Sequence, residues 1–406
     1  MLIILFLSLS VSAVNAQDEG FIYGRVTTID DNVYEGPIRW DDEECYWTDM
    51  FNASKEENEY LDYLSRDEMD YLEESKRDRW SGNSWVKVNW GDWDWDEDYV
   101  HQFSVQFGEL KSLKPFSRSS VDVELQNGMV VEVDGDGYND IGSDVVVKDP
   151  ELGEIDLNWG RIDKIEFLPT PKKLDNKFGK PLYGTVETDF GEFTGFVQWD
   201  HDERVSTDKL DGDTYDGDVS IDFGKIKSIE RYGSSRSIVV LQSGRELELR
   251  GSNDVNDENR GVIVTVEGLG RVDVNWDDFE KVTFTNAPGS GRSYKDFSSQ
   301  NKIKGTVQTT EGTSHSGEIV FDLDEAYDFE VLHGKEDDSE FIIPFRNIRN
   351  IRPRNYEYSR VVLKNGDELM LGDSQDVSDR NEGILVFEGR DPIYIPWKKV
   401  DEINID

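Results

Sequence analysis

The feature that most constrains this chain is an internal repeat that occurs three times. Each copy opens with a strand that carries the pattern Gly-x-Val-x-Thr, at residues 23–28, 183–188 and 304–309. A second glycine follows each opening and leads to an aromatic residue and an Asp: Trp40-Asp41, Trp199-Asp200 and Phe321-Asp322. Such internal similarity predicts a tandem-repeat architecture. Residues that all three copies share are therefore expected to perform one structural role three times.

Each copy divides into two halves with a similar plan. Short runs of Val, Ile, Phe and Trp alternate with polar residues and end at Gly, Asn or Asp, which is the pattern of β-strands and turns. The second half of each copy begins with a glycine hairpin, as at Ser243-Gly244, and closes on a strand that ends in Trp, as at 272–276. We therefore expect an all-β protein of three tandem repeats, each built from two small β-barrels.

The strand at 193–200 and the strand pair at 221–229 resemble the first and last strands of Sm-like and SH3-like small barrels. The resemblance implies that each half-unit is a closed barrel of this kind, which leaves few exposed sheet edges. The Asp of the Sm pattern would correspond to Asp200, and to Asp41 and Asp322 in the other copies. The basic segment through which Sm proteins bind RNA has no counterpart here, so RNA binding is not implied.

Composition predicts the boundaries of the repeats. Residues 1–16 form an apolar stretch that ends in small residues, which predicts a signal peptide and export. Residues 169–180 and 287–300 are rich in Pro, Gly, Ser or Lys, which is typical of linkers. The resulting domains are repeat 1 (17–168), repeat 2 (181–286) and repeat 3 (301–406).

Repeat 1 is longer than the others because of an insertion at about 48–103. Residues 55–79 lack Gly and Pro and place Tyr and Leu at helical spacing, which predicts a helix capped by Asn52 or Ser54. A tryptophan-rich segment follows. Its rings either pack beneath the helix or form a face that binds a ligand or partner. The candidate binding residues are Trp80, Trp85, Trp90, Trp93 and Trp95.

An acidic corner follows the aromatic residue in every copy. Several carboxylates in one turn could bind Ca²⁺, which takes six to eight oxygen ligands. Asp and Glu just after a strand also cap turns by accepting hydrogen bonds from backbone N–H groups. Calcium is the only cofactor that the sequence suggests, and both interpretations stay open. The candidate metal ligands are Asp41, Glu43, Glu44, Asp200, Asp202, Glu203, Asp322, Asp324 and Glu325.

A second acidic motif lies in the second half of each copy, at Asp140, Asp254 and Asp376. In repeat 1 it follows a segment from Asp134 that resembles part of a calcium loop. The twelfth position of that segment is Val145, whereas an EF-hand loop requires a bidentate Glu there. The motif therefore predicts an Asx-turn or a metal site of a different kind.

Charge narrows the class of partner. The chain has 87 acidic and 44 basic residues and a formal net charge of −43. Such a field repels phosphate backbones, which argues against nucleic acids and anionic membranes as partners. The sequence also lacks the common enzyme motifs and any later apolar stretch long enough to insert into a membrane.

We expect a non-enzymatic binding or scaffolding module in the periplasm or outside the cell, with a protein or glycan of the cell envelope as its partner. The alternative is a carbohydrate-binding or carbohydrate-active protein that uses the Trp-rich insertion.

Overall fold

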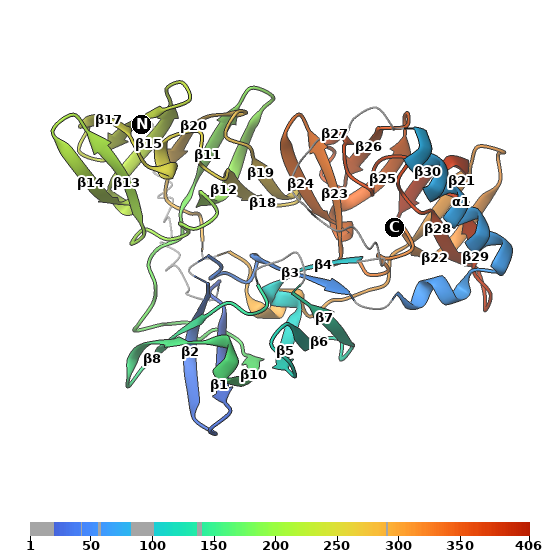
Figure 1. The fold of residues 1–406 in the computed structure, drawn as a ribbon, viewed down its shortest axis with the longest axis horizontal. Helices are drawn as coiled ribbons and strands as arrows, with labels where there is room; N and C mark the ends of the chain where they lie inside the picture. The colour runs from blue at the N-terminus through green and yellow to red at the C-terminus, as the bar shows by residue number, and fades with distance from the viewer. Residues whose placement is uncertain (1–19, 42, 56–57, 83–100, 136–139, 290) are drawn as a thin grey trace, which may run out of the picture.

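The computed structural model describes residues 20–41, 43–55, 58–82, 101–135, 140–289 and 291–406. It confirms an all-β protein, with one α-helix among the described residues. The strands form three successive sets of ten, which we call unit 1 (β1–β10), unit 2 (β11–β20) and unit 3 (β21–β30). Figure 1 shows unit 1 below units 2 and 3, which lie next to each other.

The strand bounds of the three units are as follows. Unit 1 contains β1 (Tyr23–Thr28), β2 (Val33–Trp40), β3 (Met50–Lys55), β4 (His101–Gln106), β5 (Leu110–Pro115), β6 (Ser120–Leu125), β7 (Val130–Asp134), β8 (Val145–Asp149), β9 (Gly153–Leu157) and β10 (Ile162–Phe167). Unit 2 contains β11 (Tyr183–Thr188), β12 (Glu192–Trp199), β13 (Lys209–Thr214), β14 (Gly217–Asp222), β15 (Ile226–Arg231), β16 (Arg236–Leu241), β17 (Glu246–Arg250), β18 (Val262–Val266), β19 (Gly270–Val274) and β20 (Phe279–Phe284). Unit 3 contains β21 (Lys304–Thr309), β22 (Ser314–Val320), β23 (Val331–Glu336), β24 (Ser339–Pro344), β25 (Ile348–Pro353), β26 (Tyr358–Leu363), β27 (Glu368–Gly372), β28 (Ile384–Phe387), β29 (Ile393–Ile395) and β30 (Val400–Ile405).

Strand pairing follows one scheme in all three units. In unit 1 the order across the sheet is β4-β3-β7-β6-β5-β10-β1-β2-β8-β9. Antiparallel pairs at the equivalent places connect the strands of unit 2 and those of unit 3. The order is symmetric about the β5–β10 pair.

This pairing corrects the expectation of two barrels per unit. β3 of the first half pairs with β7 of the second half, and β8 of the second half pairs with β2 of the first. Neither half closes on itself, because each contributes strands to the sheet of the other. Five short strands bury little apolar surface alone. In unit 1, Val26 and Trp40 of the first half share one core cluster with Val123 and Val145 of the second.

Units 2 and 3 are joined through a strand pair. β19 of unit 2 pairs with β24 of unit 3, with Val272 opposite Phe341. One core cluster extends through both units, whereas unit 1 has a sheet and a core cluster of its own. The segment between units 2 and 3, expected to be a linker at 287–300, crosses unit 1. Its helical turn η6 (Tyr294–Phe297) inserts Tyr294 and Phe297 into the core of unit 1.

The predicted helix of the insertion begins later than expected. β3 extends to Lys55, so Asn52 and Ser54 are strand residues, and the prediction that either one caps the helix is wrong. A short 3₁₀ segment, η1 (Glu59–Tyr63), precedes α1 (Arg66–Gly82). Ser65 caps α1 in a capping-box arrangement: its Oγ accepts the backbone N–H of Glu68 at 3.4 Å, and its own N–H donates to the Glu68 carboxylate at 2.8 Å.

Helix α1 packs on unit 3 although the chain enters it from unit 1 (Figure 1). Leu72 of α1 is 1% exposed and lies against Leu323 and Leu385. Leu323 stands where the other copies carry Asp42 and His201, so this one position of the corner is apolar in unit 3 and polar in its counterparts. Among the described helices, none is long and apolar enough to cross a membrane.

Candidate functional site

Each acidic corner is a tight turn behind a buried aromatic residue. The N–H groups of Trp40, Trp199 and Phe321 donate to the carbonyl of the closing Glu of the corner, over 2.8, 2.8 and 2.7 Å. The leading Asp has positive φ in every copy, at 43°, 50° and 50°. Asp tolerates this left-handed conformation better than most residues, which explains why it stands there.

The leading Asp of the corner ties the two halves of its unit together. Oδ1 of Asp200 accepts the backbone N–H of Arg260 at 2.6 Å, and Oδ2 accepts the side-chain amide of Asn253. Asp322 accepts from the Gln375 side chain at 2.9 Å. In unit 1, Asp41 accepts the Ser143 hydroxyl at 2.8 Å. These contacts are those of a turn-capping carboxylate.

The second acidic motif holds the third strand of each unit. Oδ2 of Asp140, Asp254 and Asp376 accepts a backbone N–H from the third strand at 2.5, 2.6 and 2.6 Å. The carbonyls of Asp140 and Asp254 accept the indole N–H of the corner tryptophan in the same unit. Burial raises the pKa of Asp140 to about 7 and the pKa values of Asp254 and Asp376 to about 6.

The closing Glu of each corner faces this second-motif Asp. One carboxylate oxygen, Oε2, of Glu44, Glu203 and Glu325 is buried and has no hydrogen-bond partner among the residues that the structure describes. Burial, followed by the charge of Asp254, raises the pKa of Glu203 to about 9. Burial and the second-motif Asp also raise the pKa values of Glu44 and Glu325 well above the usual range. Neighbouring buried carboxyl groups favour the protonated form, because two ionised groups would repel each other and no solvent would screen that repulsion.

Metal binding at the corners stays a prediction. Within the described residues, no group of three or more His, Cys, Asp or Glu side chains is arranged to hold a metal ion. The leading Asp residues instead accept hydrogen bonds from backbone N–H, side-chain amide or hydroxyl donors. The nine proposed ligands lie in three corners, and Glu43 of the unit 1 corner faces Asp202 of the unit 2 corner.

Cationic side chains reach all three corners. Nζ of Lys55, at the end of β3 in unit 1, lies 2.8 Å from Asp324 and 3.2 Å from Glu330 of unit 3. A polar cavity of about 230 Å³ surrounds this contact between the two units. Arg260 of unit 2 pairs with Asp202 and lies 3.6 Å from Glu43 of unit 1. Burial and the facing Asp202 carboxylate raise the pKa of Glu43 to about 7.

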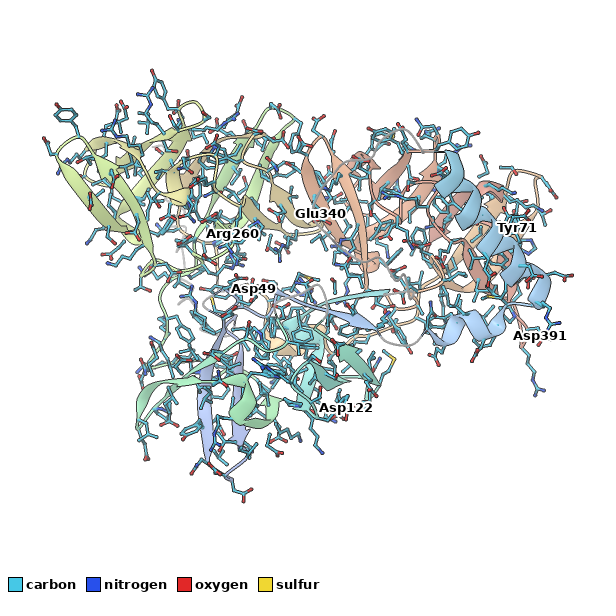
Figure 2. All side chains as sticks on the ribbon, viewed as in Figure 1. Asp49, Tyr71, Asp122, Arg260, Glu340 and Asp391 are labelled. Carbon is cyan, nitrogen blue, oxygen red and sulfur yellow. The ribbon has the colours of Figure 1, made fainter. Side chains whose placement is uncertain are left out.

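Units 1 and 2 each contribute one arginine that forms an ion pair with an Asp of the other unit. Arg39 of unit 1 lies 2.8 Å from Asp208 of unit 2, and Arg204 of unit 2 lies 2.8 Å from Asp49 of unit 1. The side chains of Arg204 and Asp49 are only 1% and 3% exposed. Figure 2 shows Asp49, Arg260 and Glu340 around the middle of the molecule, where the three units face one another.

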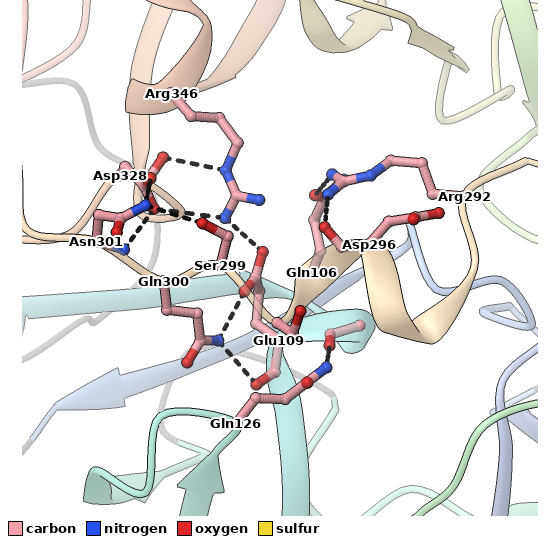
Figure 3. A network of polar contacts seen from close by, with 12 residues as sticks. Gln106, Glu109, Gln126, Arg292, Asp296, Ser299, Gln300, Asn301, Asp328 and Arg346 are labelled. Carbon is pink, nitrogen blue, oxygen red and sulfur yellow. Dashed lines mark hydrogen bonds and ion pairs between the residues drawn. The ribbon is translucent and has the colours of Figure 1, made fainter. Parts of the chain in front are cut away.

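A further buried network joins unit 1 to unit 3 (Figure 3). Glu109, which is fully buried after β4, accepts Arg346 of unit 3 at 2.5 Å and the Gln300 side chain at 2.7 Å. Burial raises the pKa of Glu109, and the Arg346 charge opposes that shift. The network places the segment between units 2 and 3 directly over unit 1.

The candidate binding tryptophans fall largely outside the described residues. Trp85, Trp90, Trp93 and Trp95 belong to 83–100, and Trp80 is described only as part of the α1 backbone. Their binding role stays a prediction.

A groove of about 680 Å³ lies between α1 and unit 3. Tyr71, labelled on α1 in Figure 2, stands on its helical side, and Lys398 Nζ lies 4.4 Å from the centre of the Tyr71 ring. Sequence reasoning missed this groove because its walls come from opposite ends of the chain. The other lining residues include Arg354, Asn355, Tyr356, Asp379, Tyr394 and Trp397.

Comparison with protein-family models, with curated proteins and with solved structures gave no match.

Proposed function

We propose that this chain is an exported, non-enzymatic binding protein, and that its ligand site is the groove between α1 and unit 3. The observation that carries the proposal is the groove itself. Its volume of about 680 Å³ falls within the roughly 300–1,000 Å³ range of pockets that enclose small ligands. Aromatic and polar side chains converge on it, which is the usual composition of such sites.

The three units act as a scaffold for this groove. Helix α1 is inserted in unit 1, but it forms a wall of a site on unit 3. The groove therefore depends on the docking of unit 1, which Lys55 supports through Asp324 and Glu330. A rigid scaffold lowers the ordering cost of binding.

The sequence repeat and the recurring pairing order support a common origin for the three units. We propose that each unit is one copy of a module whose two halves, similar to Sm-like and SH3-like strands, have exchanged strands. Export to the periplasm or the cell exterior is part of the same proposal and rests on residues 1–16. Calcium at the acidic corners and ligand binding by the Trp-rich segment are separate proposals.

A fragment screen by ¹⁹F NMR tests the proposed site without knowledge of the ligand. The protein is the chain without residues 1–16, and the two variants are Tyr356→Ala and Tyr215→Ala. Tyr356 lines the groove and is 80% exposed, whereas Tyr215 is 95% exposed in unit 2. Neither truncation removes core packing. We expect fragment binding that Tyr356→Ala weakens and Tyr215→Ala leaves unchanged. Fragments that bind both variants equally well, or no fragment binding, would contradict the proposal.

A further inference from the structure

We propose that the ligand of the groove beside α1 is a neutral oligosaccharide, an inference that rests on the proposed function. The groove is distinguished by aromatic side chains on several of its walls. Tyr71 comes from α1, Tyr356 from the β25–β26 loop, and Tyr394 and Trp397 from the segment around β29. Tyr and Trp provide large contact surfaces with few rotatable bonds, so little conformational entropy is lost when a ligand packs on them.

Aromatic faces suit one surface of a sugar ring. The face of an aromatic ring carries partial negative charge. The C–H groups of a pyranose lie beside oxygen atoms and carry partial positive charge, so a C–H-rich sugar face is attracted to the aromatic face. The edge of the same sugar carries hydroxyl groups, which must find polar partners.

The polar groups of the groove can provide those partners. A hydroxyl both donates and accepts hydrogen bonds. Donors are present at Arg354, at Lys398 and at the side-chain amide of Asn355, whose Oδ1 already accepts the N–H groups of Glu357 and Tyr358. Glu74 of α1 supplies an acceptor. Donors and acceptors beside aromatic rings match a polyhydroxylated ligand.

The charges of the groove argue against anionic ligands and lipid tails. Two cationic residues, Arg354 and Lys398, are accompanied by Glu74, Asp379 and Glu382. A phosphate or nucleic acid would be repelled by these acids and by the net charge of −43. A lipid tail would have to displace water from the charged groups without compensating them. A neutral ligand avoids both penalties.

The three units provide an internal comparison for the aromatic lining. Tyr356 stands where unit 2 has Ser234 and unit 1 has Arg118, in the same hairpin. Tyr394 is the middle residue of β29 and lies three residues before Trp397, at the position where the other units have Asp273 and Asp156. The two aromatic residues are therefore specific to the unit that α1 covers. Residues not shared by the copies are the ones expected to serve a function of one copy alone.

The test is a neutral-glycan array followed by calorimetry of the retained glycan, with the chain from Gln17 onward. Maltohexaose, cellohexaose, xylohexaose and chitohexaose are titrated directly as soluble probes. We expect saturable binding of at least one neutral glycan. Tyr356→Ala should weaken that binding at least tenfold, while Tyr215→Ala, on the exposed hairpin of unit 2, should not change it.

Three results would overturn the inference. Failure of every neutral glycan to bind, while fragments still bind the groove, would leave the proposed function standing and reject the ligand class. Glycan binding that survives Tyr356→Ala but is lost when Trp85, Trp90, Trp93 and Trp95 are replaced by Ala would assign the sugar to the Trp-rich segment. If neither fragments nor neutral glycans bind the groove of the wild-type protein, the proposed function is rejected as well.

Discussion

The joint between units 2 and 3 differs in kind from the joint that holds unit 1 against them. β19 pairs with β24, and the two units share one apolar core. Unit 1 has its own sheet and core and meets the other units through ion pairs such as Arg204–Asp49 and Lys55–Asp324. Apolar contacts accompany them where α1 packs on unit 3, where η6 enters the unit 1 core, and in two smaller clusters. Buried charges are tolerated only when each one meets its partner, so they fix the docking geometry of unit 1.

The strand joint contains one charge conflict of its own. Asp273 of β19 stands opposite Glu340 of β24, and like charges in such a pair are unfavourable. His201 lies 2.9 Å from Asp273, and His333 lies 3.1 Å from Glu340. Burial lowers the pKa of His333, but the Glu340 contact outweighs it and the pKa is raised. Each of these two acids therefore has a histidine partner, and other polar contacts, such as that of the Ser339 hydroxyl with Asp278, also cross the joint.

The largest effect is expected when the shared core of units 2 and 3 is broken. Phe341 is fully buried in β24, opposite Val272, and Phe341→Ala should lower the free energy of unfolding by about 3–5 kcal/mol. Urea unfolding measures the change. Phe116→Ala is the control, because Phe116 is 52% exposed and its loss should change stability by at most about 0.5 kcal/mol. Equal effects from the two substitutions would contradict the shared core.

Breaking the joint between unit 1 and unit 2 should lower the free energy of unfolding by nearly as much, but for an electrostatic reason. Arg204→Ala leaves the Asp49 carboxylate buried without its cation, a loss of about 3–5 kcal/mol in comparable cases. Adding Asp49→Asn should recover part of the loss, because the unpaired charge is then gone. A double-mutant cycle by urea unfolding gives the coupling. Strictly additive losses would show that the pair does not hold the joint.

The sequence predicts much of this fold and little of its assembly. Alternation in segments such as 236–241 specifies which face of a strand is buried, so the all-β class follows directly. It does not specify the partner strand, so the exchange between β3 and β7 could not be seen. One residue in the sequence could have indicated that α1 packs on unit 3. Leu323 is apolar at a position where the other copies carry Asp42 or His201, and it contacts α1. Nothing in the sequence indicates that Arg204 pairs with Asp49, because a charged residue does not identify its partner.

The buried acids predict a stability that falls as pH rises. The pKa of Glu203 is raised from 4.5 to about 9, so its contribution is fully present below pH 4.5 and is lost as pH rises through about 9. The wild-type melting temperature should therefore decrease between pH 6 and pH 9. Glu203→Gln should flatten that decrease, by at most about 1.4 kcal/mol per pH unit. Identical slopes for both proteins would show that Glu203 ionises normally.

The smallest effect is expected from calcium. The leading Asp of each corner already accepts hydrogen bonds, as Asp200 does from Arg260. Turn capping therefore predicts the same melting temperature in EDTA and in millimolar Ca²⁺ at matched ionic strength. A site that binds Ca²⁺ at 100 times its dissociation constant would instead add about 2.7 kcal/mol. A rise specific to Ca²⁺ would establish the corners as ion sites.

Hydrogen exchange of the wild type and Lys55→Met tests the difference between the two joints most directly. The substitution leaves Asp324 and Glu330 buried without the ammonium group that lies between them. The account predicts faster amide exchange in β3 and α1, where unit 1 and its helix contact unit 3, with unchanged exchange in β19 and β24. Faster exchange in β19 and β24 to the same extent, or no change in α1, would contradict a separately docked unit 1.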